Sequence, residues 1–332
     1  VISGTNGNII KAGTGTLTLS GANTYTGTTT INAGDLTVSG SLHDSTAVTI
    51  ASGADYNVDA SDTVASIEGA GDIVIASSQT LTAGDGNDKT LSGVISGAGN
   101  YIKAGSGTQT LTGNNSYTGS TTISAGLLKI IRDDPTSYLA ATSGFTGPGN
   151  LTIESSGDDF TADIVTGTHV QLAGTALGNL IIGKTGNTRQ IDLSSDITTT
   201  GTQTYNGPVR LVGGDRTVST TNSNVIFAST VNSDGTQRAL TVTNGTGDTT
   251  FSGAIGGSAP VKSLTITSDQ LTAGAITLNG ALTATLGGSS SITGVIANGA
   301  STANLVKAGS GTLTLSASNT YTGTTQVSAG TL

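Results

Sequence analysis

One 26-residue segment occurs three times in this chain of 332 residues, without a gap in any copy. It reads KAGTGTLTLSGANTYTGTTTINAGDL at 11–36, and close variants occupy 103–128 and 307–332. Repetition of this kind is typical of architectures in which each unit packs against its neighbours along the chain, so that stability is a sum of neighbouring contacts. The repeat therefore constrains the fold more than any other feature of the sequence.

Apolar and polar residues alternate within the repeat. Leu17 and Leu19 fall on one side of GTLTLSG, while Thr16, Thr18 and Ser20 fall on the other. Alternation of period two with many β-branched residues indicates strands. Gly, Asn and Asp separate these short runs, as turns require. No apolar stripe of helical period persists, so we predict an all-β fold of many short strands.

The spacing of the copies favours a coiled architecture. The tyrosine of the repeat recurs after 92 and then 204 residues, and division by four and by nine gives about 23 residues each time. A turn of about 20–25 residues can hold three short strands and three turns, as in a right-handed parallel β-helix, or β-solenoid. Sandwich, barrel and propeller are the alternatives that short strands alone leave open.

We assign structural roles to individual positions of the repeat. The tyrosine shares the parity of an inward isoleucine and is predicted in the core, and the preceding asparagine is predicted to bond the backbone in a turn. A change of phase at Ala33-Gly34 predicts a bend that keeps both flanking apolar sets inside. The opening lysines, Lys11, Lys103 and Lys307, are predicted in solvent-facing turns. The predicted structural positions are Asn23, Tyr25, Gly27, Gly34, Asn115, Tyr117, Gly119, Gly126, Asn319, Tyr321, Gly323 and Gly330.

Residues 129–150 interrupt the pattern, with two prolines, an acidic pair and two aromatic residues. We predict an irregular loop there, between coils over 1–128 that carry two repeats and coils over 151–332 that end in the third.

The composition excludes several classes of function. The net charge is -9, with only 12 Lys and Arg, which opposes binding to nucleic acid or anionic lipid. The chain has no Cys, so disulfides, thiolate metal sites and a Cys nucleophile are excluded. It also contains no apolar run long enough for a membrane-spanning helix.

Candidate catalytic residues are few. His43 and His169 lie far apart in the chain, and adjacency of His, Asp and Ser at 43–45 does not build a triad. The pairs Asp133-Asp134 and Asp158-Asp159 could serve a polysaccharide-active enzyme, which would also need clustered Arg, Lys and aromatic residues. Aromatic residues are only 3% of the chain. We therefore predict no catalytic residue and no enzyme.

One segment offers possible metal ligands. In GDGNDK at 84–89, the side chains of Asp85, Asn87 and Asp88 offer oxygen atoms of the kind that calcium prefers. A polar turn is the favoured interpretation, and calcium is kept as the weaker one. No other cofactor is expected.

The repeated text GxGTLTLSGxNTYTGxTTxxAGxL, present at 11–36, 103–128 and 307–332, resembles the passenger-associated transport repeat, also called the autotransporter-associated β-strand repeat. A looser similarity, from TQTYNGPV at 202–209 to SLTI at 263–266, connects the chain to filamentous-haemagglutinin-like adhesins.

These resemblances imply a right-handed β-helix stalk of a secreted bacterial surface protein, which mediates adhesion or aggregation. They imply an extracellular location, with anchoring to the outer membrane through parts not in this chain, and a non-catalytic role. The expected partners are a host or neighbouring-cell surface, or other copies of the chain through homotypic or end-to-end contacts. Two alternatives remain: a self-assembling extracellular fibre or matrix subunit, and a polysaccharide-active β-helix lyase or glycosidase.

Overall fold

The computed structural model describes residues 1–135, 144–172 and 177–332. Strands and turns account for the structure of these residues, and no helix occurs among them. The part of the chain that is described therefore offers no helix capable of crossing a membrane. The contacts divide the chain into unit 1, Val1–Ile153 with Gln171–Ala173, and unit 2, Glu154–Val170 with Gly174–Leu332.

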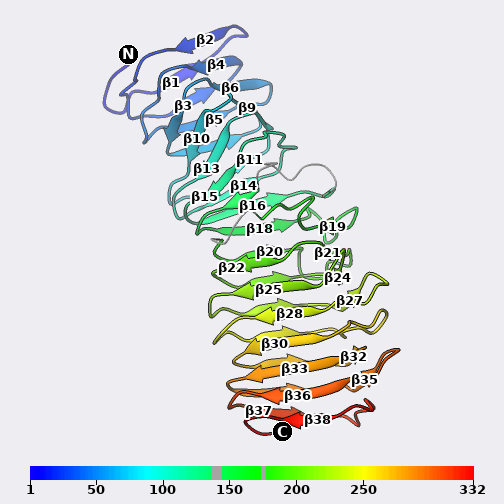
Figure 1. Ribbon diagram of the computed structural model, residues 1–332. Coiled ribbons are helices and arrows are strands. Elements are labelled where there is room, and N and C mark those ends of the chain that lie inside the picture. The colour runs from blue at the N-terminus through cyan, green and yellow to red at the C-terminus, as the bar shows by residue number, and fades with distance from the viewer. Residues whose placement is uncertain (136–143, 173–176) are drawn as a thin grey trace. The chain divides into compact units, whose positions relative to one another are not determined.

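Unit 1 is a β-solenoid whose successive turns add parallel strands to three sheets (Figure 1). Sheet A contains β1 (Ile9–Lys11), β3 (Thr29–Ile31), β5 (Ala47–Ile50), β8 (Ser66–Gly69), β11 (Lys89–Leu91), β14 (Thr108–Leu111), β16 (Leu127–Ile131) and β18 (Asn150–Glu154). Sheet B contains β2 (Thr16–Leu19), β4 (Gly34–Val38), β6 (Ala54–Val58), β9 (Asp72–Ile75) and β12 (Ile95–Gly97). Sheet C contains β7 (Asp62–Val64), β10 (Thr80–Ala83), β13 (Asn100–Lys103), β15 (Thr121–Ile123) and β17 (Phe145–Thr146).

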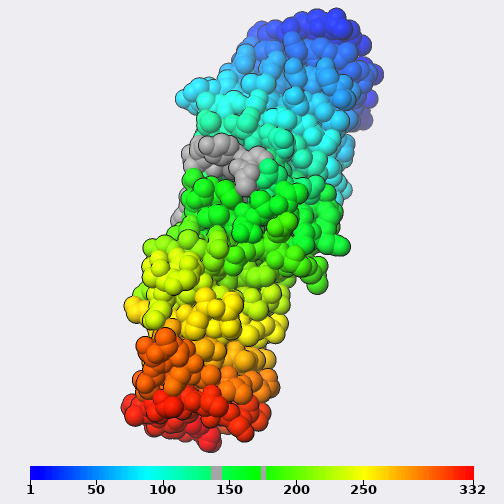
Figure 2. All heavy atoms as spheres, turned by 90° about the vertical axis from the view of Figure 1, so that its right-hand side faces the viewer, coloured from blue at the N-terminus to red at the C-terminus, as the bar shows by residue number. Residues whose placement is uncertain are grey.

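Unit 2 has the same architecture. Sheet D contains β20 (Leu180–Ile182), β23 (Gln203–Tyr205), β26 (Val225–Phe227), β29 (Thr249–Phe251), β31 (Leu271–Ala273), β34 (Ser289–Ile292) and β37 (Thr312–Leu315). Sheet E contains β19 (Ile164–Val165), β21 (Ile191–Leu193), β24 (Val209–Leu211) and β27 (Val231–Ser233), and a separate pair is formed by β32 (Ile276–Leu278) and β35 (Ile296–Asn298). Sheet F contains β22 (Ile197–Thr199), β25 (Arg216–Thr220), β28 (Leu240–Thr243), β30 (Leu264–Ser268), β33 (Ala281–Leu286), β36 (Asn304–Ala308) and β38 (Thr325–Val327). On the face of unit 2 seen in Figure 2, colour advances turn by turn, so each turn contributes a narrow band of surface.

The core is a set of columns of inward side chains, one from each turn. Leu36, Tyr56 and Ile73 occupy the same register on β4, β6 and β9, and all three are fully buried. Successive turns bury each other's apolar side chains while the backbone groups pair between turns, so no single deep core is needed. The predicted all-β parallel solenoid is therefore confirmed.

The register shows that turns differ in length. Ile9 pairs with Thr29, whereas Val225 in unit 2 pairs with Thr249, so this turn of unit 2 takes more residues than the first turn of unit 1. Division of the spacing between the first two copies into four equal turns was wrong. The first copy begins on sheet A and the second begins on sheet C, so a whole number of turns does not separate them.

The predicted irregular segment at 129–150 is regular at both of its ends. Strand β16 extends to Ile131, β17 covers Phe145–Thr146, and β18 begins at Asn150. Residues 136–143 lie outside the described part of the chain. The guanidinium of Arg132, which follows β16, donates a hydrogen bond of 2.9 Å to the carbonyl of Gly113 on the preceding turn. The solenoid thus continues into part of the segment predicted to leave it.

Candidate functional site: a lysine cage between turns

Each copy of the repeat spans two consecutive turns of the solenoid. In the first copy, β1 pairs with β3 and β2 pairs with β4, all in parallel. The second copy pairs β13 with β15 and β14 with β16 in the same way, and the third pairs β36 with β38. The repeat therefore encodes a contact between neighbouring turns.

The opening lysine of the repeat is buried, which corrects the prediction of a solvent-facing turn. Lys103 is only 1% exposed and Lys307 is 0% exposed. The Lys11 ammonium donates hydrogen bonds of 2.7 Å to the carbonyl of Gly13 on its own turn and 2.7 Å to that of Ala33 on the next turn. Equivalent carbonyl partners are those of Ala104, Gly105 and Ala125 for Lys103, and of Ala308, Gly309 and Ala329 for Lys307. We call this arrangement the lysine cage.

The side chain can reach the cage because the chain turns sharply at two stacked Ala-Gly corners. Gly13 has φ of 77° and Gly34, one turn later, has φ of 64°, values that favour glycine. The left-handed conformation directs successive carbonyls toward the lysine. A Cβ on Gly34 would lie 2.7 Å from the carbonyl oxygen of Gly13, so the second corner also needs glycine to stack closely on the first. The predicted bend at Ala33-Gly34 is the second of these corners.

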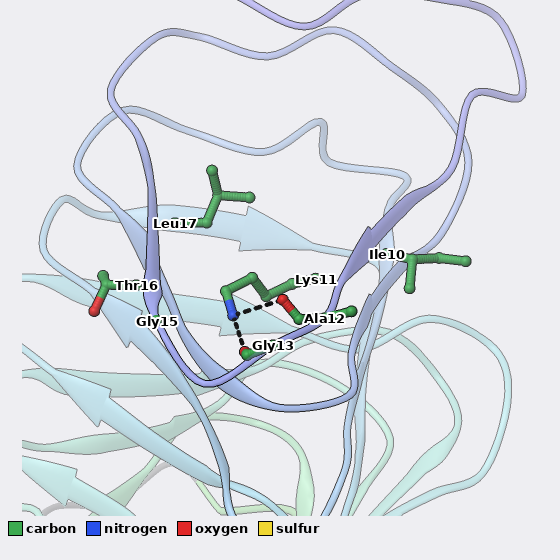
Figure 3. A pocket seen from close by; sticks show the side chains of 7 residues that line it. All are labelled: Ile10, Lys11, Ala12, Gly13, Gly15, Thr16 and Leu17. Atoms are coloured by element: carbon green, nitrogen blue, oxygen red, sulfur yellow. Dashed lines mark hydrogen bonds between the residues drawn. The ribbon is translucent and has the colours of Figure 1, made fainter.

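Figure 3 shows the first cage from a pocket of about 380 Å³ that is lined by the loop from Ile10 to Leu17. The Lys11 side chain curls back over its own corner, so that its nitrogen points at the carbonyls of Ala12 and Gly13. Ile10, on the opposite side of the strand, is 67% exposed. The alternation of β1 therefore directs the charged residue inward and the apolar residue outward, which the residue types alone do not suggest.

Burial lowers the pKa of the Lys103 ammonium, because the charged form loses hydration, and the nearby Asp85 and Asp88 carboxylates partly oppose this shift. Burial also lowers the pKa of Lys307. Within the described part of the chain, the hydrogen-bond acceptors of the Lys103 ammonium are three backbone carbonyls and no carboxylate. Such charge-assisted hydrogen bonds are stronger than neutral ones and fix the two turns to each other.

An asparagine just before the repeat was missed by the sequence reasoning. The Asn8 Oδ1 accepts a hydrogen bond of 2.8 Å from the Thr28 amide on the next turn. Asn100 and Asn304 accept equivalent bonds from Ser120 and Thr324, each of 2.8 Å. A Cβ on Gly27 would collide with the Asn8 side chain, which explains the glycine at that position. The signal was available, because each copy is preceded by Asn and two apolar or aromatic residues.

The asparagine inside the repeat connects to the turn before it. Asn23 Oδ1 accepts a hydrogen bond of 2.8 Å from the Ile2 amide, and its Nδ2 donates one of 2.8 Å to the carbonyl of Gly21. Asn115 and Asn319 accept from the amides of Ile95 and Ile296 at 2.7 and 2.8 Å. The side chain bonds the backbone, as predicted, and it also joins two turns.

The tyrosine of the repeat lies in the core of the first two copies. Tyr25 and Tyr117 are each 1% exposed, and their hydroxyls lie 2.5 Å from Thr29 Oγ1 and Thr121 Oγ1. Tyr321 makes the equivalent contact with Thr325 at 2.6 Å but is only half-buried. The hydroxyl pair satisfies both polar groups inside an apolar column.

The cage predicts that its lysines resist acylation. When the folded protein is treated with an amine-reactive acetylating reagent at neutral pH, Lys103 is expected to react at least tenfold more slowly than Lys262, whose side chain is 55% exposed. The Lys103 ammonium is buried and hydrogen-bonded to the three carbonyls, so the reagent cannot reach it. Peptide mass mapping measures both rates, and a denatured sample provides the control in which they should become equal. Equal rates in the folded protein would contradict the cage.

The predicted calcium ligands are engaged elsewhere. Asp85 Oδ1 accepts a hydrogen bond of 2.7 Å from the Asn87 amide, and Asp88 Oδ1 accepts one of 2.7 Å from the Thr108 amide. The positive charge of Lys103 acts on both carboxylates and opposes a bound cation. In the described ranges, no three His, Cys, Asp or Glu side chains come together in a way that could hold a metal ion. The segment is a polar turn that caps the next turn.

The other acidic and histidine candidates also bond their local backbone. His43 Nδ1 lies 2.8 Å from Ser45 Oγ and accepts from the Ser45 amide, and His169 Nδ1 accepts from the Val165 amide at 3.1 Å. Asp159 accepts hydrogen bonds from the hydroxyl and amide of Thr188, which lower its pKa. Asp133 and Asp134 each have an interaction with another group, so neither can be described as a free catalytic acid. These contacts connect turns or close loops.

One carboxylate cluster was not foreseen. Asp35, Asp55 and Asp72 occupy the same register on β4, β6 and β9 of sheet B. Burial and then the charges of Asp35 and Asp72 raise the pKa of Asp55. The sequence could have shown part of this cluster, because residues 12–88 contain nine acidic residues and no Lys or Arg. Only the register brings these three together.

Removing the central charge should stabilise the protein in a pH-dependent way. Because the folded-state pKa of Asp55 is raised, the folded state binds more protons than the unfolded state, and stability falls as the pH rises through that pKa. Asp55→Asn should therefore raise the free energy of unfolding at pH 7 by roughly 0.2–1 kcal/mol. The gain should fade as the pH falls through about 3.9, the ordinary pKa of aspartate, and should be largely absent well below it, where the carboxyl is protonated in both states. Urea unfolding at pH 7 and pH 3 tests this, and a gain that persists at pH 3 would rule out the charge as its cause.

Comparison with known families identifies the segments that carry the cages. The Passenger-associated-transport-repeat family matches residues 9–38, 102–130 and 305–332. These three segments are passenger-associated-transport repeats. Each match includes the opening lysine and extends past the second corner, so each transport repeat coincides with one two-turn contact.

The transport-repeat matches and the β-solenoid fold are consistent with a secreted, cell-surface passenger. Searches of the curated proteins and of the solved structures gave no significant match. The similarity of 202–266 to filamentous-haemagglutinin-like repeats is not confirmed by any comparison and stays a prediction.

Proposed function

We propose that this chain is a non-catalytic stalk segment of a secreted bacterial surface protein, in which the transport repeats act as fasteners between turns. The observation that carries the proposal is the lysine cage. In each repeat the charged side chain at the corner is buried and bound to backbone carbonyls of two turns. A ligand-binding lysine would have to leave these partners, whereas a structural lysine uses all of them.

A fastener of this kind suits an extended secreted chain. In a solenoid, each turn contacts only its neighbours, so the chain can open wherever one interface is weak. The cage and the two asparagine bonds add polar contacts to the same interface. Such contacts are directional, so they also fix the register in which one turn stacks on the next.

We further propose that the stalk serves adhesion, either to a host or neighbouring-cell surface or to other copies of the chain. The segment would act outside the cell, with anchoring at the outer membrane supplied by other parts of the protein. The net charge of -9 disfavours direct contact with anionic lipid or nucleic acid. Self-association into a fibre or matrix is the alternative within the same class.

Adhesion can be tested with beads that carry the purified chain. Coated beads are expected to bind to each other or to cells several-fold more than beads coated with an unrelated protein of similar charge. Aggregation of coated beads alone would favour homotypic contact, and binding to cells alone would favour a heterotypic partner. If the folded chain mediates neither, the adhesive role is wrong, although the stalk role could still hold.

The enzyme alternative rests on the three aligned carboxylates of Asp35, Asp55 and Asp72. A raised pKa at Asp55 is what a general acid needs, but both charges that act on it are negative, and no Lys or Arg occurs in residues 12–88 to bind an acidic sugar. Release of reducing ends or of unsaturated sugars from a panel of polysaccharides would establish this alternative. Loss of that activity in Asp55→Asn would locate it.

A further inference from the structure

The outer face of sheet F in unit 2 carries a regular array of hydroxyl groups. The strands β28, β30 and β33 read LTVT, LTIT and LTAT in their paired residues, with the threonines at matching positions. Their register places Thr241, Thr265 and Thr283 in one column. A second column, two positions further along each strand, contains Thr243, Thr267 and Thr285. We call these six residues the threonine array.

The array faces outward because of the strict alternation of the sheet. The residues between the threonines, Val242, Ile266 and Ala284, are each 0% exposed. Thr243 is exposed, and the other five members are half-buried among their neighbours. The hydroxyls of the array carry no hydrogen bond to the part of the protein that is described, whereas those of Thr198 and Ser219, beside it, lie 2.8 Å apart. The array thus presents its hydroxyls to the surroundings of the protein, where water or another hydrogen-bonding partner can reach them.

The geometry of the array is periodic in two directions. Adjacent strands of a sheet lie about 4.8 Å apart, and residues i and i+2 of one strand lie about 6.6 Å apart. Threonine is β-branched and has few χ1 rotamers, so the methyl and hydroxyl groups repeat with the backbone. Figure 1 shows β25, β28, β30, β33 and β36 stacked in the same direction, so the array lies on a continuous sheet. Val306 and Ala308 on β36 end the pattern of hydroxyls on that side.

The chemistry of the array restricts its partner. None of its six positions is ionisable, so the partner is not selected by charge. The hydroxyls can donate and accept hydrogen bonds, and their repeat demands a partner with hydrogen-bonding groups at the same spacing. No aromatic side chain stands among the six positions to stack on a sugar ring. A crystal of water meets these conditions, because ordinary ice has planes in which oxygen atoms repeat in two directions at spacings close to those of the array.

We propose that the threonine array of sheet F binds crystalline ice. The threonine hydroxyls replace water at lattice positions, and the intervening methyl groups order the water between them. This role is independent of the adhesive function proposed above. If the array binds ice, ice would be an additional surface to which the stalk can attach. A polysaccharide crystal is the competing periodic partner, and it is an outcome of the test.

The test measures incorporation of the purified protein into ice grown slowly on a cooled probe from a stirred solution. Wild-type protein is expected in the ice at several times the concentration found for serum albumin. Thr265→Tyr, at the centre of the array, should fall to the albumin level because the bulky ring breaks the spacing. Thr204→Tyr is the matched control, because Thr204 is a half-buried outward residue at the centre of β23 on sheet D, and its register neighbours are Ile181 and Ile226 rather than hydroxyl residues. It should behave as wild type.

Both variants are first checked by circular dichroism and thermal unfolding, and Thr283→Lys replaces Thr265→Tyr if that variant does not fold. Exclusion of the wild-type protein from ice overturns the proposal. Unchanged incorporation of the array variant, or equal loss in array and control variants, also overturns it. Sedimentation with cellulose or chitin powder, without incorporation into ice, would identify a polysaccharide as the partner instead and would likewise overturn it.

Discussion

Replacing Lys103 by methionine is expected to lower the free energy of unfolding by about 2–4 kcal/mol. Methionine fills the space of the lysine stem but leaves the carbonyls of Ala104, Gly105 and Ala125 without their donor. Each carbonyl loses its hydrogen bonds to water on folding. In the variant no protein donor replaces them, so the cost of desolvation is not compensated. Urea unfolding followed by circular dichroism measures the effect.

Lys89→Met is the matched control for this substitution. Lys89 lies on β11 of the same unit, and its ammonium forms an ion pair of 3.0 Å with Glu68, with side-chain exposures of 24% and 35%. Partly exposed pairs of this kind contribute about 0–1 kcal/mol. If Lys103→Met destabilises the protein no more than Lys89→Met, the cage does not fasten the turns, and the central observation behind the stalk proposal fails.

Phe227→Ala is expected to lower the free energy of unfolding by about 3–5 kcal/mol. Phe227 is fully buried between Tyr205 and Phe251, with ring centroids 5.1 and 4.8 Å away and nearly parallel planes. Truncation removes both stacking contacts and leaves a cavity, because the backbone spacing of the sheet prevents the two outer rings from closing the gap. The midpoint of urea unfolding should fall accordingly.

Ile226→Ala tests whether this loss belongs to the column. Ile226 is the preceding residue on the same strand and points outward, where it is half-buried. Its truncation should change the free energy of unfolding by less than about 1 kcal/mol, since surface substitutions have small effects. An effect as large as that of Phe227→Ala would contradict the assignment of the core to the inward column.

Much of the fold could be predicted because the strands and turns of the solenoid are determined by patterns that extend over only a few residues. The alternation around Leu17 indicated strands, and the phase change at Ala33-Gly34 indicated a corner that the structure places there. The length of a turn was harder to predict, because the number of turns between two copies depends on which sheet each copy begins on. Copies on sheets A and C are not separated by whole turns, and the sequence does not state the face.

The lysine was misplaced for a physical reason. Lys is rarely buried, so a lysine in a Gly-rich corner is ordinarily exposed. Here its burial depends on carbonyls that a left-handed glycine turns inward, and one of them, from Ala33, belongs to the next turn of the solenoid. The sequence shows that lysine, alanine and glycine recur together. It does not show that the lysine ammonium contacts the alanine carbonyl of the next turn.

The sequence by itself determined the class of fold, the repeat and the residues that recur in it, since hydrophobic alternation and turn chemistry act over a few residues. The tertiary structure decided which residues meet between turns: the lysine cage, the asparagine bonds, the carboxylates of sheet B and the threonine array of sheet F. Their contacts join positions that lie one full turn apart in the chain. Such contacts depend on the register of stacked strands, and a slip by one residue would exchange every inward side chain for an outward one.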